Sequence, residues 1–168
     1  MPVSNLIFAP TRRRRFASMV YEGILLFGVV FIVSTIFDVL TESRSALMYR
    51  HSRQALVFVA IGVYFVLSWH SKAKTLPMKT WHMRLVSKTG GKASLWQLLW
   101  RYLLIWPLPL LSALAIKGLV QKTGYTPADL LVVITPFTLF IPTWFRQDGQ
   151  FLHDHLAGTR LITDRPIQ

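Results

Sequence analysis

Four long apolar runs constrain this chain more than any other feature. They cover residues 16–40, 54–70, 95–119 and 128–145, and polar segments separate them. A bilayer core is about 30 Å thick, and a helix that crosses it needs about 20 mainly apolar residues. In lipid, backbone N–H and C=O groups have to be hydrogen-bonded within the segment, so each run is expected to be a helix. We therefore predict an all-α membrane protein, a bundle of four transmembrane helices in a single domain over residues 1–168, with the second run at the lower limit of length.

The composition supports this prediction and argues against a soluble class. Hydrophobic residues make up 52% of the chain, charged residues 15%, and the mean hydropathy is +0.41. A net charge of +12 is compatible with nucleic-acid binding, but the basic residues lie between the apolar runs, as membrane flanks do. We expect the lipid bilayer as the partner, and no nucleic acid. The chain has no cysteine, which excludes disulfides and thiol chemistry.

The distribution of Lys and Arg predicts the orientation in the membrane. Thirteen of these residues lie before the first run, in the second loop or after the fourth run, and five lie in the first loop or at and after the end of the third run. Because cytoplasmic segments carry the excess of positive charge, both termini and the second loop are expected in the cytoplasm. The first run is too long for the apolar part of a signal peptide and no cleavage site follows it, so it is interpreted as a retained span.

Two charged residues are predicted to lie within the bilayer. Glu22 and Arg101 each lie six residues into a run that enters from the cytoplasmic side, about 9 Å deep at 1.5 Å per residue. Charged residues at this depth usually face the bundle interior and pair, so we predict a Glu22–Arg101 contact, direct or through water. Arg15 precedes Glu22 by seven residues and shares its helical face. The alternatives are that the pair only fixes helix packing, or that Arg101 extends to the headgroups.

The second loop and the tail each contain a candidate strand. "MRLVSKTGGK" (83–92) indicates an extended piece followed by a glycine turn, and "AGTRLIT" (157–163) indicates a turn followed by a strand. Both lie on the predicted cytoplasmic side, where they could pair. His153, Asp154 and His155 are also in the tail, but histidines two apart in a helix point in opposite directions, so no metal site is expected. No enzyme motif or cofactor-binding loop is present in the sequence.

Three segments in order resemble the RDD family of membrane proteins, which is named for one arginine and two aspartates. They are "RRFASMVYEG", "KTLPMKTWHMRLVSKTGGKASLWQLLWRYLL" and "RQDGQFLHDHLAGTRLI". The resemblance implies that Arg15 is the family arginine, Asp154 is the second aspartate, and Glu22 stands where the family has its first aspartate. Arg101 matches an arginine common at its position, whereas Pro77 replaces the usual glycine.

The resemblance implies a multi-pass protein of the bacterial inner (plasma) membrane with a transport-type function, in some relatives cation/proton exchange. We expect Arg15, Glu22, Arg101 and Asp154 to form the functional cluster, with Glu22 responding to an unidentified ion or small ligand. A homo-oligomer is an open alternative, since one four-helix chain barely encloses a pathway. The rival functions are a non-transporting scaffold or accessory subunit, and a lipid-binding factor that uses the basic second loop.

Overall fold

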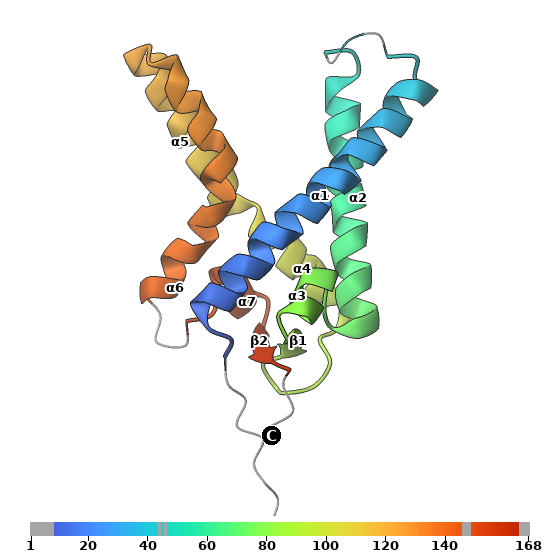
Figure 1. The fold of residues 1–168 in the computed structure, drawn as a ribbon, viewed down its shortest axis with the longest axis vertical. Helices are drawn as coiled ribbons and strands as arrows, with labels where there is room; N and C mark the ends of the chain where they lie inside the picture. Colours follow the sequence, from blue (N-terminus) through green and yellow to red (C-terminus); the bar gives the residue numbers. More distant parts are fainter. Residues whose placement is uncertain (1–8, 44, 46, 146–148, 165–168) are drawn as a thin grey trace, which may run out of the picture. The chain divides into compact units, whose positions relative to one another are not determined.

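The structure is a computed structural model that describes residues 9–43, 45, 47–145 and 149–164 (Figure 1). The start of the predicted third RDD-like segment, residues 146–148, lies outside the described residues. In chain order the elements are α1 (Arg12–Leu40), α2 (Arg50–Lys72), α3 (Leu76–Thr80), β1 (Met83–Ser87), α4 (Leu95–Ile105), α5 (Pro107–Thr123), η1 (Thr126–Phe140), α6 (Ile141–Phe145), α7 (Leu152–Leu156) and β2 (Thr159–Thr163).

Four helical segments are long and apolar enough to cross a membrane, as predicted. They cover Arg12–Leu40, Arg50–Lys72, Leu95–Thr123 and Thr126–Phe145. The second helix is 23 residues long and so exceeds the minimum length for crossing the bilayer, whereas its apolar run alone is close to that minimum. The additional residues at the ends of the first two segments are largely polar or basic ones, which continue the helix beyond the apolar run.

Prolines divide the third span and accompany a change of helix type in the fourth. α4 ends at Ile105 and α5 begins at Pro107, because proline lacks the N–H that a continuous helix would use. In the fourth span, residues 126–140 form a 3₁₀ helix instead of the expected α-helix, with Pro136 inside it. The hydroxyls of Thr135 and Thr138 donate to carbonyls three residues earlier at 2.8 and 2.7 Å. The Thr135 bond reaches the carbonyl of Val132, which in an α-helix would accept from the N–H that Pro136 lacks.

The chain divides into two compact units. Of the described residues, the N-terminal unit comprises those within 10–85 and 162–164, and the C-terminal unit comprises residue 9 and those within 86–161. In the N-terminal unit α1 packs on α2 and on the short helix α3. In the C-terminal unit α5 and η1 form an antiparallel hairpin, and α4 packs on α7 (Figure 1). The expectation of a single domain stays a prediction.

The two predicted strands are present and they pair. β1 and β2 form a two-stranded sheet. The amide of Lys88 donates to the carbonyl of Gly158 at 2.9 Å, and the amide of Asp164 donates to the carbonyl of His82 at 2.8 Å. The strands are therefore antiparallel, since the residue after one strand pairs with the residue before the other at both ends.

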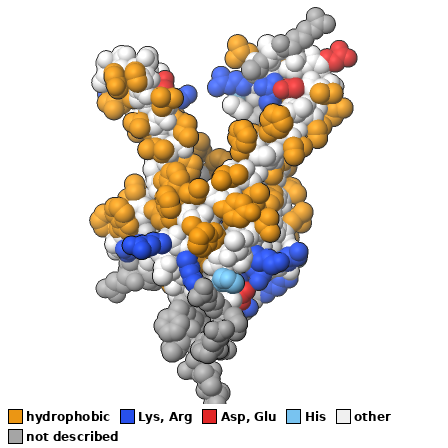
Figure 2. Space-filling model, in the orientation of Figure 1, with side chains coloured by type: hydrophobic (Ala, Val, Ile, Leu, Met, Phe, Trp, Pro, Cys, Tyr) orange, Lys and Arg blue, Asp and Glu red, His pale blue; other side chains and the backbone are white. Residues whose placement is uncertain are grey.

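The burial pattern of α1 is the reverse of that in a soluble helix. Its buried residues are Arg15, Ser18 and Glu22, all polar, whereas large apolar side chains such as Phe27 and Val39 are more than 70% exposed. Figure 2 shows apolar side chains covering the outer surface of the helices. Exposed apolar area of this extent is expected where lipid is the solvent, because lipid tails solvate such side chains.

Candidate functional site

Glu22 is held by two hydroxyl groups in the N-terminal unit. Tyr64 donates its phenolic hydrogen to Glu22 Oε1 at 2.6 Å, and Thr75 donates its hydroxyl hydrogen to Glu22 Oε2 at 2.6 Å. Glu22 is 9% exposed and Thr75 is 2% exposed. Each carboxylate oxygen therefore has a short hydrogen bond to a neutral partner, which offsets part of the cost of burying the group.

Three helices position these groups. Glu22 lies in α1 and Tyr64 lies in α2, whereas Thr75 is the N-cap residue of α3. The Thr75 hydroxyl also accepts a hydrogen bond from the amide of Met78 at 3.4 Å, as N-cap side chains do. Thr75 thus links the start of α3 to the carboxylate. The contact can form because α2 ends at Lys72 and the left-handed backbone of the next residue, Ala73 (φ 55°), turns the chain toward α3.

Arg15 and Ser18 share the buried face of α1 with Glu22. Residues 15, 18 and 22 follow the i, i+3, i+7 spacing of one helical face, and the exposed fractions of Arg15 and Ser18 are 4% and 5%. The prediction that Arg15 and Glu22 share a face is consistent with this burial. A polar stripe on the inner face of a spanning helix is the arrangement expected of residues that line a pathway or a packed polar contact.

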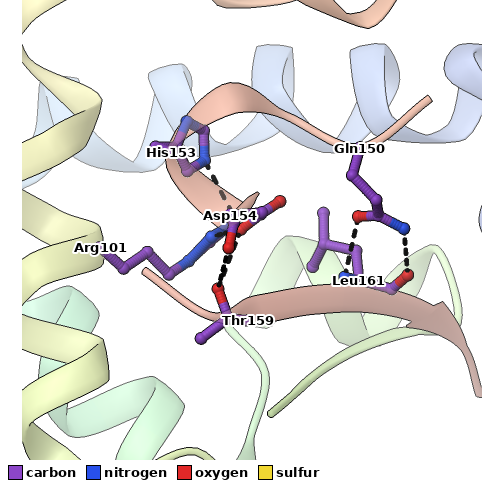
Figure 3. A network of polar contacts seen from close by, with 6 residues as sticks. All are labelled: Arg101, Gln150, His153, Asp154, Thr159 and Leu161. Atoms are coloured by element: carbon purple, nitrogen blue, oxygen red, sulfur yellow. Dashed lines mark hydrogen bonds and ion pairs between the residues drawn. The ribbon is translucent and has the colours of Figure 1, made fainter. Parts of the chain in front are cut away.

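Arg101 and Asp154 form a buried ion pair in the C-terminal unit. The Arg101 guanidinium Nη1 donates to Asp154 Oδ1, which joins α4 to α7 (Figure 3). Their side chains are 5% and 0% exposed. The Thr159 hydroxyl, at the start of β2, contacts Asp154 twice, at 3.3 Å from its backbone carbonyl and 3.4 Å from Oδ1. A fully buried carboxylate is stable only when it is paired in this way.

His153 lies beside this pair and is also buried. Its Nε2 is 3.8 Å from Asp154 Oδ1, and its ring stacks on Phe151. Burial lowers the pKa of His153 well below its ordinary value, and the positive charge of Arg101 lowers it further. The imidazole is therefore neutral at neutral pH, and the charge of Asp154 is balanced by Arg101.

Gln150 connects the segment before α7 to β2. Its side-chain amide donates to the carbonyl of Leu161 at 3.0 Å, and its side-chain carbonyl accepts from the amide of Leu161 at 3.1 Å (Figure 3). The Gln150 side chain thereby pairs with the backbone of β2 as a neighbouring strand would. This contact fixes the position of α7 relative to the strand within the same unit.

The structure resolves the predicted cluster into two groups of contacts. Glu22 and Arg15 are buried on α1 in the N-terminal unit, whereas Arg101 and Asp154 contact each other in the C-terminal unit. The Glu22–Arg101 contact would join residues of different units and stays a prediction. Sequence reasoning missed Tyr64 and Thr75. A hydroxyl near the end of a span gives no hydropathy signal, although the helix-start pattern "TLPMK" (75–79) marks Thr75 as an N-cap.

No cluster of three or more His, Cys, Asp or Glu side chains that could hold a metal ion occurs among the described residues. The described residues offer a hydrogen-bonded carboxyl group in one unit and a buried ion pair in the other.

The comparisons with known proteins identify a family but no individual relative. No curated protein and no solved structure matches the chain. The model of the RDD family matches residues 9–158, which include Arg15, Glu22, Arg101 and Asp154. The match covers most of the chain and both groups of contacts, so the protein belongs to the RDD family of membrane proteins.

Proposed function

We propose that this protein is a multi-pass protein of the bacterial inner membrane that moves a proton or another cation across the bilayer, with Glu22 as the group that binds and releases it. The observation that carries the proposal is the pair of hydroxyl partners at Glu22, Tyr64 and Thr75, each at 2.6 Å. A hydroxyl can donate a hydrogen bond or accept one. The same two partners can therefore serve a carboxylate and a protonated carboxyl group.

The position of Glu22 also supports this role. It lies in a 29-residue helix that is long enough to span the membrane, and it is buried on the polar face of that helix. Ionisable groups inside a membrane are costly, and they commonly mark ion or proton pathways. Arg15 precedes Glu22 on the same buried face, near the start of the helix. We expect a second copy of the chain to help enclose the pathway, since four helices barely do so.

A scaffold or accessory role is the second candidate, and the Arg101–Asp154 pair favours it. Both side chains are at most 5% exposed, and Thr159 adds two contacts to Asp154. Such a pair fixes the packing of α4 against α7 and requires no movement. In our proposal this pair holds the C-terminal unit together while Glu22 performs the exchange.

Flux through proteoliposomes tests the proposal. Purified protein is reconstituted with a pH-sensitive dye inside the vesicles, and a pH gradient or an inward gradient of Na⁺ or K⁺ is imposed. We expect wild type to accelerate the change in internal pH and Glu22→Gln to reduce the rate to that of protein-free vesicles. Glu42→Gln makes the same chemical change at an exposed position just after α1, so it should keep the wild-type rate.

Two results would contradict the proposal. One is the absence of flux in wild type under every gradient. The other is an unchanged rate in Glu22→Gln with a wild-type elution profile in size-exclusion chromatography. If wild type shows no flux and Glu22→Gln lowers the thermal unfolding temperature, the carboxylate only holds α1, α2 and α3 together, and the scaffold role is the correct one.

A further inference from the structure

The segment that follows α2 is basic and has few carboxylates to balance it. Between Glu42 and Asp129 the chain has no Asp or Glu, whereas the second loop (71–94) alone has six Lys and Arg. Four of these six lie in the N-terminal unit, at positions 72, 74, 79 and 84. Figure 2 shows basic side chains gathered at this end of α2. A concentration of positive charge at the end of a span attracts anionic groups.

The carboxylate of Asp164 forms ion pairs with two of these four basic side chains. Asp164 Oδ2 lies 2.8 Å from Lys74 Nζ, and Asp164 Oδ1 lies 3.7 Å from Arg84 Nε. Lys72 and Lys79 are exposed, and neither forms an ion pair with any residue that the structure describes. Lys72 ends α2 and Lys79 lies in the last turn of α3, and these two lysines are therefore the ones available to an external anion.

Exposed apolar side chains lie beside these lysines. Leu76, the first residue of α3, is 54% exposed, and Trp81, directly after α3, is 38% exposed. Lys72 is the last residue of the second span, so this short segment begins at the membrane surface. Lysine together with tryptophan and leucine at a membrane surface is typical of a segment that lies in the lipid headgroup region.

We propose that α3 with Lys72, Leu76, Lys79 and Trp81 is a binding surface for the headgroup of an anionic phospholipid. The two lysines contact the phosphate, and the two apolar side chains enter the adjacent acyl region. The occupant is a lipid because the cations lie at the end of a spanning helix next to exposed apolar groups, where a lipid phosphate is already present.

Binding of defined lipids to the purified full chain tests this inference. Dissociation constants for phosphatidylglycerol and for phosphatidylcholine are measured by native mass spectrometry from detergent. We expect wild type to bind phosphatidylglycerol more tightly. Lys72→Gln with Lys79→Gln should weaken phosphatidylglycerol binding about 25-fold. Each lysine near the membrane surface contributes about 1 kcal/mol of binding free energy. Since 1.4 kcal/mol corresponds to a tenfold change in the dissociation constant, the loss is about five-fold per lysine. Phosphatidylcholine binding should not change.

A matched control uses the exposed lysines at the far end of α5. Lys117→Gln with Lys122→Gln removes the same charge and should keep the wild-type preference. The proposal fails if wild type shows no preference, if the Lys72 and Lys79 variant keeps it, or if the control loses it equally. If the Lys72 and Lys79 variant does not fold, the salt dependence of wild type provides the test. The preference of wild type for phosphatidylglycerol must weaken as the salt concentration rises, and a preference that does not change would contradict the proposal. Tighter binding of an acidic peptide such as polyglutamate than of phosphatidylglycerol would assign the surface to a protein partner and overturn the lipid assignment.

Discussion

Replacing Asp154 by asparagine removes the negative charge from the ion pair with Arg101 and keeps the size of the side chain. The side chain of Asp154 is 0% exposed and that of Arg101 is 5% exposed, so the guanidinium charge would remain buried without its counter-charge. Removing one partner of a buried pair typically costs about 3–5 kcal/mol. A second cost arises because Asp154 Oδ2 has no hydrogen-bond partner among the described residues, and an asparagine NH₂ at this position would lack an acceptor. We expect Asp154→Asn to lie at the upper end of this range.

Chemical unfolding in detergent, followed by tryptophan fluorescence, measures the free energy of unfolding of the variant and of wild type. Asp129→Asn is the matched control, because it makes the same change at an exposed position in the first turn of η1. The control should stay within about 1 kcal/mol of wild type. Adding Arg101→Met to Asp154→Asn removes the remaining buried charge and should recover part of the lost free energy.

Two outcomes would refute this reasoning. If Asp154→Asn costs no more than Asp129→Asn, the ion pair does not stabilise the packing of α4 on α7. If the double variant is less stable than Asp154→Asn by the full cost of the Arg101→Met single variant, the two side chains are not energetically coupled, and their proximity contributes nothing.

Two further predictions concern the same unit. Gln150→Ala should lower the free energy of unfolding by about 1–3 kcal/mol, because the buried N–H and C=O of Leu161 lose their partner. Hydrogen exchange at the Leu161 amide should accelerate in this variant. An unchanged exchange rate would contradict the prediction. The pKa of His153 in the folded protein is well below its value in the unfolded chain, which is about 6.5. Below pH about 6.5 unfolding therefore takes up a proton. The free energy of unfolding should fall there by at most about 1.4 kcal/mol for each unit that the pH is lowered. His153→Gln should flatten this dependence between pH 7.5 and 5.5, and an equal slope in both proteins would show that another group causes it.

Much of the fold was predictable because its causes are local. Hydropathy over about 20 residues decides whether a segment can cross a bilayer, and all four predicted spans are present. The strands at 83–87 and 159–163 were predictable because each is a short apolar-basic stretch next to a glycine turn. Their pairing was predictable because both were expected on the cytoplasmic side of the membrane. The 3₁₀ form of residues 126–140 was not predictable, since hydropathy over a span does not distinguish a 3₁₀ helix from an α-helix.

The burial of the four candidate residues was predictable, whereas their contacts were less so. Burial of Arg15 and Glu22 together follows from their seven-residue spacing on one helix. Equal depth in the bilayer was the basis for pairing Glu22 with Arg101, but depth alone does not select among partners. The structure shows that Asp154, more than fifty residues after Arg101, contacts its guanidinium, because the tail folds back as α7 against α4.

The hydrogen-bond partners described for the two carboxylates differ, and we base different roles on this difference. Asp154 contacts a permanently charged guanidinium, so protonating it would leave a buried positive charge uncompensated. Glu22 contacts the hydroxyls of Tyr64 and Thr75, which can accept as well as donate hydrogen bonds. A change of charge thus disrupts the ion pair around Asp154 but not the hydrogen bonds around Glu22. If one of the two groups exchanges an ion, the contacts favour Glu22, and Asp154 is the group that holds the fold in place.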